Sequence, residues 1–340
     1  AYTTINKSSE HFNTKLYTGN GGTQSITGVG FQPDFVWTKS RTTTQSHVLT
    51  DAVRGVTKTL FTNATQAEAT LSGITAFGTD GYTLGASDLW SENSASFASW
   101  NWLANGAGSA NTDGSISSTV SANTTSGFSI VSWNGNSGTI GHGLGVKPAM
   151  IIVKSRQTAN NWVVMHKGLT GGMDTNVLVL NGTGAEGGGG AGMAEPTSSV
   201  FTITSGLAAN DNNIAYCFAD VRGFSKMGSY IGNGNDDGTF VYTGFKPAFF
   251  MVKRTDLGSN WTLFDNKRAN SFNEITACLE PNTSNAEQNN NTYNDVDFVS
   301  NGIKIREGNG DLNNNGSTII YMAFAEAPLV GTNGVTAKAR

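Results

Sequence analysis

The sequence contains few charged residues, few histidines and only two cysteines. Charged side chains make up 14 % of the 340 residues, whereas roughly 25 % is usual for a globular domain. The two cysteines, Cys217 and Cys278, cannot provide a disulfide framework, and we expect free thiols because they fall at unrelated points of the chain. No stretch is rich in lysine or arginine, so we expect no nucleic-acid partner.

Long apolar runs and a leader pattern are also missing. The absence of any run of 18 apolar residues predicts no transmembrane helix and no membrane insertion. The first residues, AYTTINKSSEHFNTKLY, lack a charged segment followed by an apolar one, so we expect a soluble protein that matures in a cytosol. The 43 glycines show no three-residue period, which excludes collagen. Hydrophobic residues, at 37 %, are sufficient for packed cores.

What the sequence does contain is one unit repeated three times. The segments FQPDFVWTKSR, VKPAMIIVKSR and FKPAFFMVKRT align on a shared proline. A lysine stands six residues after each proline, a large ring fourteen after, and an aspartate or histidine eighteen after. In chain order, the prolines are Pro33, Pro148 and Pro247, the lysines Lys39, Lys154 and Lys253, the rings His47, Trp162 and Trp261, and the last set Asp51, His166 and Asp265.

The repeats predict an all-β fold. Apolar side chains occupy both faces of the strand after Pro247, as expected for a strand buried between two layers. Asn-Gly pairs separate the short apolar runs, as in tight hairpins. We count roughly eight short strands per unit and therefore predict three tandem β-sandwiches, jelly-roll or concanavalin-like, of about 100 residues each.

The repeats also set the expected domain boundaries. We predict an N-terminal arm over 1–11, sandwiches over 12–105, 127–222 and 223–329, and a C-terminal tail over 330–340. Residues 106–126 are rich in Gly, Ser and Thr, which predicts a linker or a loosely held strand. Because the two end segments lie outside the repeats, we expect them to dock onto a neighbouring copy or another protein.

Several of these motifs resemble a domain that recurs in virion proteins of marine tailed phages, those of cyanophages and pelagiphages. The resemblance spans residues 12–329 and rests on YTGNGGTQSITGVGFQPDFVWTKSR, DAVRG, GSYIGNGNDDGTFVYTGFKPAFFMVKRTD, NWTLFDNKR and IIYMAFAEAP. Such proteins are described as tail-fibre or concanavalin-like phage proteins. The resemblance implies a fibre, decoration or host-attachment protein located in the virion and assembled in the host cytoplasm. The implied partners are other virion proteins, further copies of the chain, with a trimer favoured by analogy, and a host surface glycan.

A search for catalytic groups finds no constellation shared by the three units. His47 stands where the other units have tryptophan, which favours packing over catalysis. No pair of carboxylates for glycoside hydrolysis recurs either. The repeated acids, one per unit, are expected in solvated loops: Glu68, Glu186 and Glu287. We predict a non-enzymatic protein without a cofactor; the alternative is a glycan-binding lectin or a glycan-cleaving spike-type enzyme.

Two stretches match the first half of a calcium-binding loop. The candidate ligands are Asn233, Asn235 and Asp237 in one stretch, and Asp311, Asn313 and Asn315 in the other. Neither stretch has a glutamate at the twelfth position to bind calcium with both oxygens. Asn, Asp and Gly also dominate ordinary hairpin turns. We therefore predict no bound metal and keep these six residues as weak candidates.

The three repeated lysines end an apolar strand in each unit. One interpretation is a side chain that snorkels to solvent at the rim of the sheet. The other is an ion pair across an interface. The first is favoured because lysine is rarely fully buried.

Overall fold

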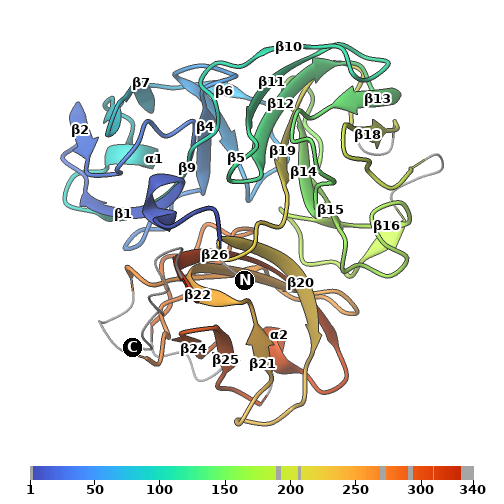
Figure 1. Cartoon of the computed structure of the whole chain (residues 1–340). Coiled ribbons are helices and arrows are strands. Elements are labelled where there is room, and N and C mark those ends of the chain that lie inside the picture. Colours follow the sequence, from blue (N-terminus) through green and yellow to red (C-terminus); the bar gives the residue numbers. More distant parts are fainter. Residues whose placement is uncertain are drawn as a thin grey trace.

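The computed structural model describes residues 3–188, 193–205, 208–268, 273–289, 294–308 and 310–330. Regular structure in these ranges is β-strand apart from three short helices, η1 (Ser8–Glu10), α1 (Asp88–Ser91) and α2 (Gly310–Asn313). The strands form three sandwiches in succession, which Figure 1 shows as three lobes around a common centre. The predicted all-β sandwich fold is confirmed.

The first sandwich pairs a six-stranded sheet with a three-stranded sheet. The larger sheet has the order β1 (Phe12–Thr18), β9 (Ser96–Trp102), β3 (Phe35–Ser40), β4 (Val48–Asp51), β5 (Lys58–Phe61) and β6 (Ala69–Thr70). The smaller has the order β2 (Gln24–Thr27), β8 (Gly81–Leu84) and β7 (Ile74–Gly78). Neighbouring strands in both sheets run antiparallel.

The second sandwich has the largest sheet of the molecule. Its order is β10 (Ser109–Asn111), β11 (Ser118–Asn123), β12 (Phe128–Asn134), β19 (Asn212–Phe218), β14 (Met150–Ser155), β15 (Val163–His166), β16 (Asn176–Val179) and β17 (Gly187–Gly188). A two-stranded sheet, β13 (Gly138–Gly141) and β18 (Val200–Ile203), lies against it.

The third sandwich repeats the same plan with fewer strands. The larger sheet has the order β20 (Ser225–Ile231), β26 (Thr318–Pro328), β22 (Phe245–Arg254) and β23 (Thr262–Asp265), and the smaller β21 (Phe240–Tyr242), β25 (Gly302–Ile305) and β24 (Val296–Val299). The four strands β20, β26, β22 and β23 correspond to β1, β9, β3 and β4 in the first sandwich and to β12, β19, β14 and β15 in the second. The sequence repeat is therefore a repeat of this four-strand order.

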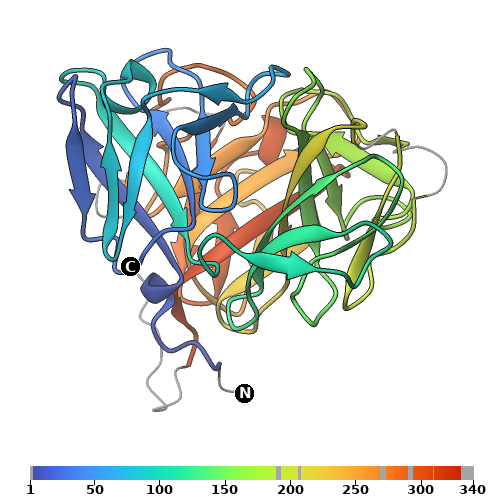
Figure 2. The same ribbon diagram turned by 90° about the horizontal axis from the view of Figure 1, so that it is seen from above.

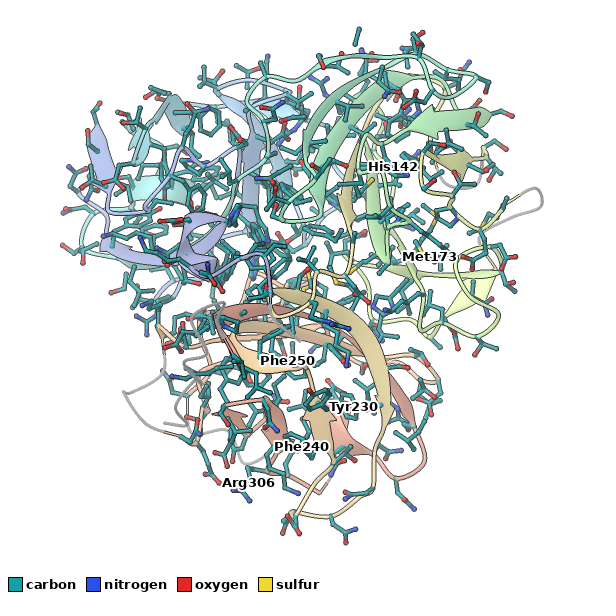
Figure 3. The ribbon with its side chains drawn as sticks, viewed as in Figure 1. His142, Met173, Tyr230, Phe240, Phe250 and Arg306 are labelled. Carbon is teal, nitrogen blue, oxygen red and sulfur yellow. The ribbon has the colours of Figure 1, made fainter. Side chains whose placement is uncertain are left out.

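The strand associated with each repeated proline is buried on both faces, because its side chains alternate between two cores. In β3, Phe35 and Trp37 face the centre of the molecule, while Val36 faces the core of the first sandwich. In β22, Phe249 faces the centre and Phe250 the core of the third sandwich. Figure 3 shows Phe250 and Tyr230 inside the third lobe and His142 and Met173 inside the second.

Four apolar cores result from this alternation. Each sandwich encloses one, and the larger sheets of all three sandwiches enclose a fourth. We call this fourth cluster the central core. Figure 2, turned by 90° and seen from above, shows the first and second sandwiches side by side, and strands of the third, which lies below them in Figure 1, are visible in the gap.

The prolines stand where a strand tolerates a missing N–H. Pro33 and Pro148 are buried and precede β3 and β14 by two residues. Pro247 lies within β22, where the pairing with β26 shifts its register. Strand starts and bulges are the positions that accept proline in a sheet.

The segment 106–126 is not a linker. It contains β10 and β11, and β11 pairs with β12 along its whole length. Val120 points into the core of the second sandwich. Of the two alternatives that the composition left open, a linker or a loosely held strand, the structure therefore shows strands, held by ladder hydrogen bonds and this apolar contact.

The N-terminal segment covers the molecule's own core. Ile5 is 3 % exposed and belongs to the central core. Helix η1 packs against β26, and the His11 ring lies 5.8 Å from the ring of Phe224. Residues 3–11 therefore pack against their own chain, and their docking onto a neighbouring copy or another protein stays a prediction. Of the predicted tail over 330–340, residues 331–340 lie outside the described residues.

Candidate functional site

Equivalent rings from the three sandwiches meet in the central core. Trp102, Phe218 and Phe324 occupy the same position near the end of β9, β19 and β26. Their ring centroids lie 6.3 Å, 5.5 Å and 6.0 Å apart in the three pairings. Aromatic pairs at such distances contribute about 0.5–1.5 kcal/mol each beyond their burial. These three rings form a triangle around an approximate threefold axis, and each sandwich contributes one ring to it.

Buried ion pairs join the first sandwich to the second. Arg54 donates to Asp51 and, at 3.0 Å, to Glu68. Arg156 of the second sandwich holds Glu68 with two hydrogen bonds of 3.0 Å, and the Tyr216 hydroxyl donates to Asp51 at 2.8 Å. Burial would raise the pKa of Glu68, but the hydrogen bonds and charges of Arg156 and Arg54 outweigh it and lower that pKa.

The same arrangement joins the third sandwich to the first. Arg268 donates to Asp265 and, at 3.0 Å, to Glu287. Arg41 of the first sandwich holds Glu287 with two hydrogen bonds of 2.8 and 2.7 Å, and Trp100 donates from its ring N–H to Asp265 at 3.0 Å. Burial would raise the pKa of Asp265, yet the charge and hydrogen bonds of Arg268 lower it. Each carboxylate of this network is therefore held by a guanidinium group.

The junction between the second and third sandwiches uses neutral groups. His166 stands where the others have aspartate, and its Nδ1 accepts from Gly168 N–H at 2.9 Å. Its Nε2 therefore carries the proton and donates to the Tyr321 carbonyl oxygen at 3.1 Å. Burial lowers the pKa of His166 to about 4, so the ring is neutral. Glu186 makes only a backbone contact here, its N–H donating to the carbonyl of Thr255 at 2.7 Å.

The three junctions form a cycle. Tyr216 of the second sandwich donates to Asp51 of the first, and His166 of the second donates to the Tyr321 carbonyl of the third. Trp100 of the first sandwich donates to Asp265 of the third, which closes the cycle. The expectation that the repeated glutamates lie in solvated loops is wrong for Glu68 and Glu287, whose side chains are 12 % and 3 % exposed. They are the acceptors of the interface ion pairs.

The repeated rings lie one residue before β4, β15 and β23 and are all buried. Trp162 donates from its ring N–H to the Phe61 carbonyl of the first sandwich at 2.7 Å. Trp261 donates in the same way to the Val179 carbonyl of the second at 3.0 Å. His47 instead accepts from Trp37 at 3.0 Å within its own sandwich. Both tryptophans therefore hold a neighbouring sandwich as well as filling a core.

The repeated lysines follow neither interpretation. Lys39, Lys154 and Lys253 are fully buried, and their ammonium groups donate chiefly to backbone carbonyls at the ends of their strands. Lys154 also reaches the Thr65 carbonyl of the first sandwich at 3.1 Å. No carboxylate among the described residues pairs with them directly. Burial lowers the pKa of all three to about 8.

The two calcium-like stretches come together at the outer end of the third sandwich. The side-chain amide N–H of Asn313 donates to Asn233 Oδ1 at 2.8 Å and to the Asn235 carbonyl at 2.8 Å. Asp237 forms an ion pair with Lys304 at 2.7 Å, and Asp311 accepts from Asn260 N–H at 3.1 Å. An amide donor thus stands where a cation would need oxygen ligands. The described ranges contain no group of three or more His, Cys, Asp or Glu placed to hold a metal.

Cys217 and Cys278 are buried free thiols, as the sequence predicts. Burial raises the pKa of each to about 12, so neither is a thiolate at neutral pH. Of the helices that the structure describes, none is long and apolar enough to cross a membrane.

One family model covers nearly the whole chain. It describes a domain of unknown function, DUF7483, and matches residues 7–328. The chain belongs to the DUF7483 family. No curated protein and no solved structure matches it. The match runs from η1 to the end of β26, so this DUF7483 domain consists of the three sandwiches together.

Sequence reasoning missed the partners of the repeated acids, although a signal for them exists. Arg41 and Arg156 both stand eight residues after the proline of their units, and Thr255 takes that place in the third. The loss of arginine at this position in the third unit coincides with the loss of the ion pair to Glu186. The remaining partners, Tyr216 and Trp100, carry no repeat signal because the side chain at that position differs in each unit.

Proposed function

We propose that this DUF7483 protein is a non-enzymatic structural component of a tailed-phage virion that acts in host attachment as a fibre or decoration protein. The observation that supports this most is the closed cycle of junctions around the central core. It makes one chain into a rigid block with an approximate threefold axis. Trimeric phage fibres have the same symmetry, so such a block fits the end of a threefold assembly.

The repeated polar residues support a structural role over a catalytic one. Glu68 and Glu287 are held by two arginines each, and Asp51 and Asp265 by an arginine and a ring donor. These contacts lower the pKa of Glu68 and Asp265, whereas the general acid of glycoside hydrolysis needs a raised pKa. The proposal keeps other virion proteins, further copies of the chain and a host glycan as its partners.

The test is the composition of purified particles. We expect mass spectrometry of gradient-purified virions to detect the chain at a fixed ratio to the major capsid protein. A phage replication enzyme, which is made in the infected cell but not packaged, serves as the control for contamination. Recovery of the chain at no higher level than this enzyme contradicts the proposal. A particle density map then locates the chain in the head, neck or tail.

A further inference from the structure

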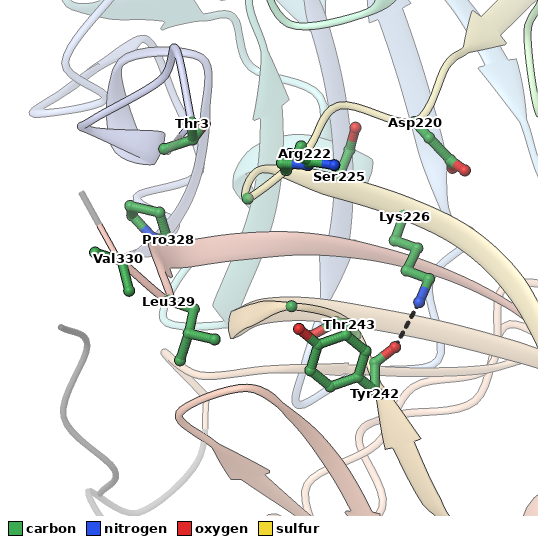
Figure 4. A pocket seen from close by; sticks show the side chains of 12 residues that line it. Thr3, Asp220, Arg222, Ser225, Lys226, Tyr242, Thr243, Pro328, Leu329 and Val330 are labelled. Atoms are coloured by element: carbon green, nitrogen blue, oxygen red, sulfur yellow. Dashed lines mark hydrogen bonds between the residues drawn. The ribbon is translucent and has the colours of Figure 1, made fainter. Parts of the chain in front are cut away.

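A pocket of about 630 Å³ opens beside the segment that connects the second sandwich to the third, and none of the residues that line it makes the junction contacts described above. Figure 4 shows the segments that line it: the turn before β20, the first residues of β20, the end of β21 with the turn that follows it, and the end of β26 with the two residues after it. Thr3 closes one side. Its volume falls in the range of roughly 300–1,000 Å³ that small-ligand sites occupy.

One wall of the pocket is an exposed aromatic ring on a strand. Tyr242 is 53 % exposed, and the Lys226 ammonium lies 5.3 Å from the centroid of its ring. The same ammonium donates to the Tyr242 carbonyl at 2.6 Å, which anchors β21 to β20 (Figure 4). Pro328 and Leu329 add apolar surface nearby. A rigid ring with polar groups around it suits a ligand that is apolar on one face and hydroxylated at its edge.

The charges in the pocket favour an anion. Arg222 is exposed and forms no hydrogen bond or ion pair with any described residue. Asp220, the carboxylate of the pocket, is paired with Lys167 and accepts from Met227 N–H at 2.8 Å. Two cations, Arg222 and Lys226, therefore line the pocket. Asp220 is the one acid among its lining residues, and Lys167 already neutralises its charge. A planar guanidinium with free donors matches a carboxylate in two-point geometry.

We propose that this pocket binds an acidic sugar, a hexuronic acid residue of a surface polysaccharide. The carboxylate pairs with Arg222, the apolar face of the sugar ring lies on Tyr242, and a ring hydroxyl accepts from Lys226. This inference deepens the proposed attachment function and rests on it for the source of the sugar.

The first test uses the full chain with D-glucuronic acid as the probe, in saturation-transfer NMR and calorimetry. D-glucose has the same ring without the carboxylate, and inorganic phosphate has the charge without the ring. We expect glucuronate to bind at least tenfold more tightly than either. Undetectable glucuronate binding, equal binding of glucose, or binding of phosphate as tight as glucuronate overturns the proposal.

Variants localise the site. Arg222→Ala and Tyr242→Ala should each weaken glucuronate binding at least fivefold. Phe240→Ala is the matched control, because Phe240 lies on the same strand at 45 % exposure but outside the lining of the pocket. Unchanged affinity in both pocket variants overturns the proposal. A chain found in virions that does not bind glucuronate overturns this inference alone, whereas a chain that binds glucuronate but is absent from virions overturns the proposed function alone.

Discussion

Arg54 and Arg268 are fully buried guanidinium groups, each with an aspartate three residues before it and a glutamate on the other side. Burial would lower the pKa of both, but these carboxylates raise it, so both arginines stay charged. A buried charge is tolerated only while its partners remain in place. Removing one partner leaves an unpaired charge in an apolar environment, and the resulting loss of folding stability exceeds the net stability that the intact pair contributes.

The Glu68→Gln substitution tests this dependence. It removes the charge shared by Arg54 and Arg156, and we expect a loss of roughly 3–5 kcal/mol in the free energy of unfolding, as for other broken buried pairs. The control is Glu186→Gln, because among the described residues the Glu186 carboxylate accepts only from Thr170 and has no arginine partner. Urea denaturation compares the two. Equal losses in both variants would show that the ion pair adds nothing.

The Trp261→Ala substitution tests the repeated ring position. The ring is 1 % exposed in the central core and donates to the second sandwich, so we expect a loss of about 3–5 kcal/mol. Trp261→Phe keeps an aromatic ring and loses the N–H donor, so its loss should be clearly smaller. Denaturation of both variants gives the comparison. A native-like unfolding midpoint for Trp261→Ala is the outcome that contradicts burial of the ring.

At the scale of elements, the strands near the prolines carry the architecture because both of their faces are apolar. One face closes a sandwich and the other closes the central core. The N-terminal segment is a further element of the central core, since Ile5 lies in it while Lys7 and Glu10 form an exposed pair on the same segment. This segment therefore stabilises the fold besides any role in assembly.

Ile5→Ala measures that contribution. Truncation of a buried isoleucine typically costs about 2–5 kcal/mol, and we expect a loss in this range from thermal and urea unfolding. Lys7→Ala, which removes one side of an exposed ion pair, should change stability by less than about 1 kcal/mol. If Ile5→Ala is as stable as the parent, the segment is not part of the core.

At the scale of the whole molecule, the three sandwiches should unfold as one body. Each exposes the inner face of its larger sheet if its neighbours are removed, and the cycle of junctions links each sandwich to the other two. Two-state behaviour is common for single cooperative cores and is lost when domains are independent. We therefore expect the three repeats to show a single unfolding transition by calorimetry, and separate transitions would contradict this.

The junction between the second and third sandwiches predicts a pH dependence. The pKa of His166 is about 4 in the folded chain and about 6.5 in the unfolded chain, so between these values the unfolded state binds more protons. Stability at this junction is therefore complete above about pH 6.5 and is lost as pH falls toward 4. His166→Asn keeps a donor for the Tyr321 carbonyl but does not titrate, so the parent should lose more stability than this variant between pH 6.5 and 4.5. Parallel unfolding curves for the two proteins across that range would contradict the prediction.

The sequence by itself determined the number of units, the strands near the prolines and the burial of the repeated rings. These are local properties: alternation in Phe249 and Phe250 is visible within one strand, and offsets from Pro33, Pro148 and Pro247 need no knowledge of the fold. The sequence also predicted correctly that the two cysteines form no disulfide, because they occupy different positions in two different units.

Only the tertiary structure decided that the units share a core and which polar groups meet across it. The partners Glu68 and Arg156 lie 88 residues apart, and Arg41 and Glu287 lie 246 apart. No local pattern specifies such pairs, because which units become neighbours depends on how three sheets pack their apolar inner faces. The same packing explains why the repeated lysines are buried: the strand ends they occupy are covered by loops and by adjacent sandwiches, and the carbonyls found there take the place of water.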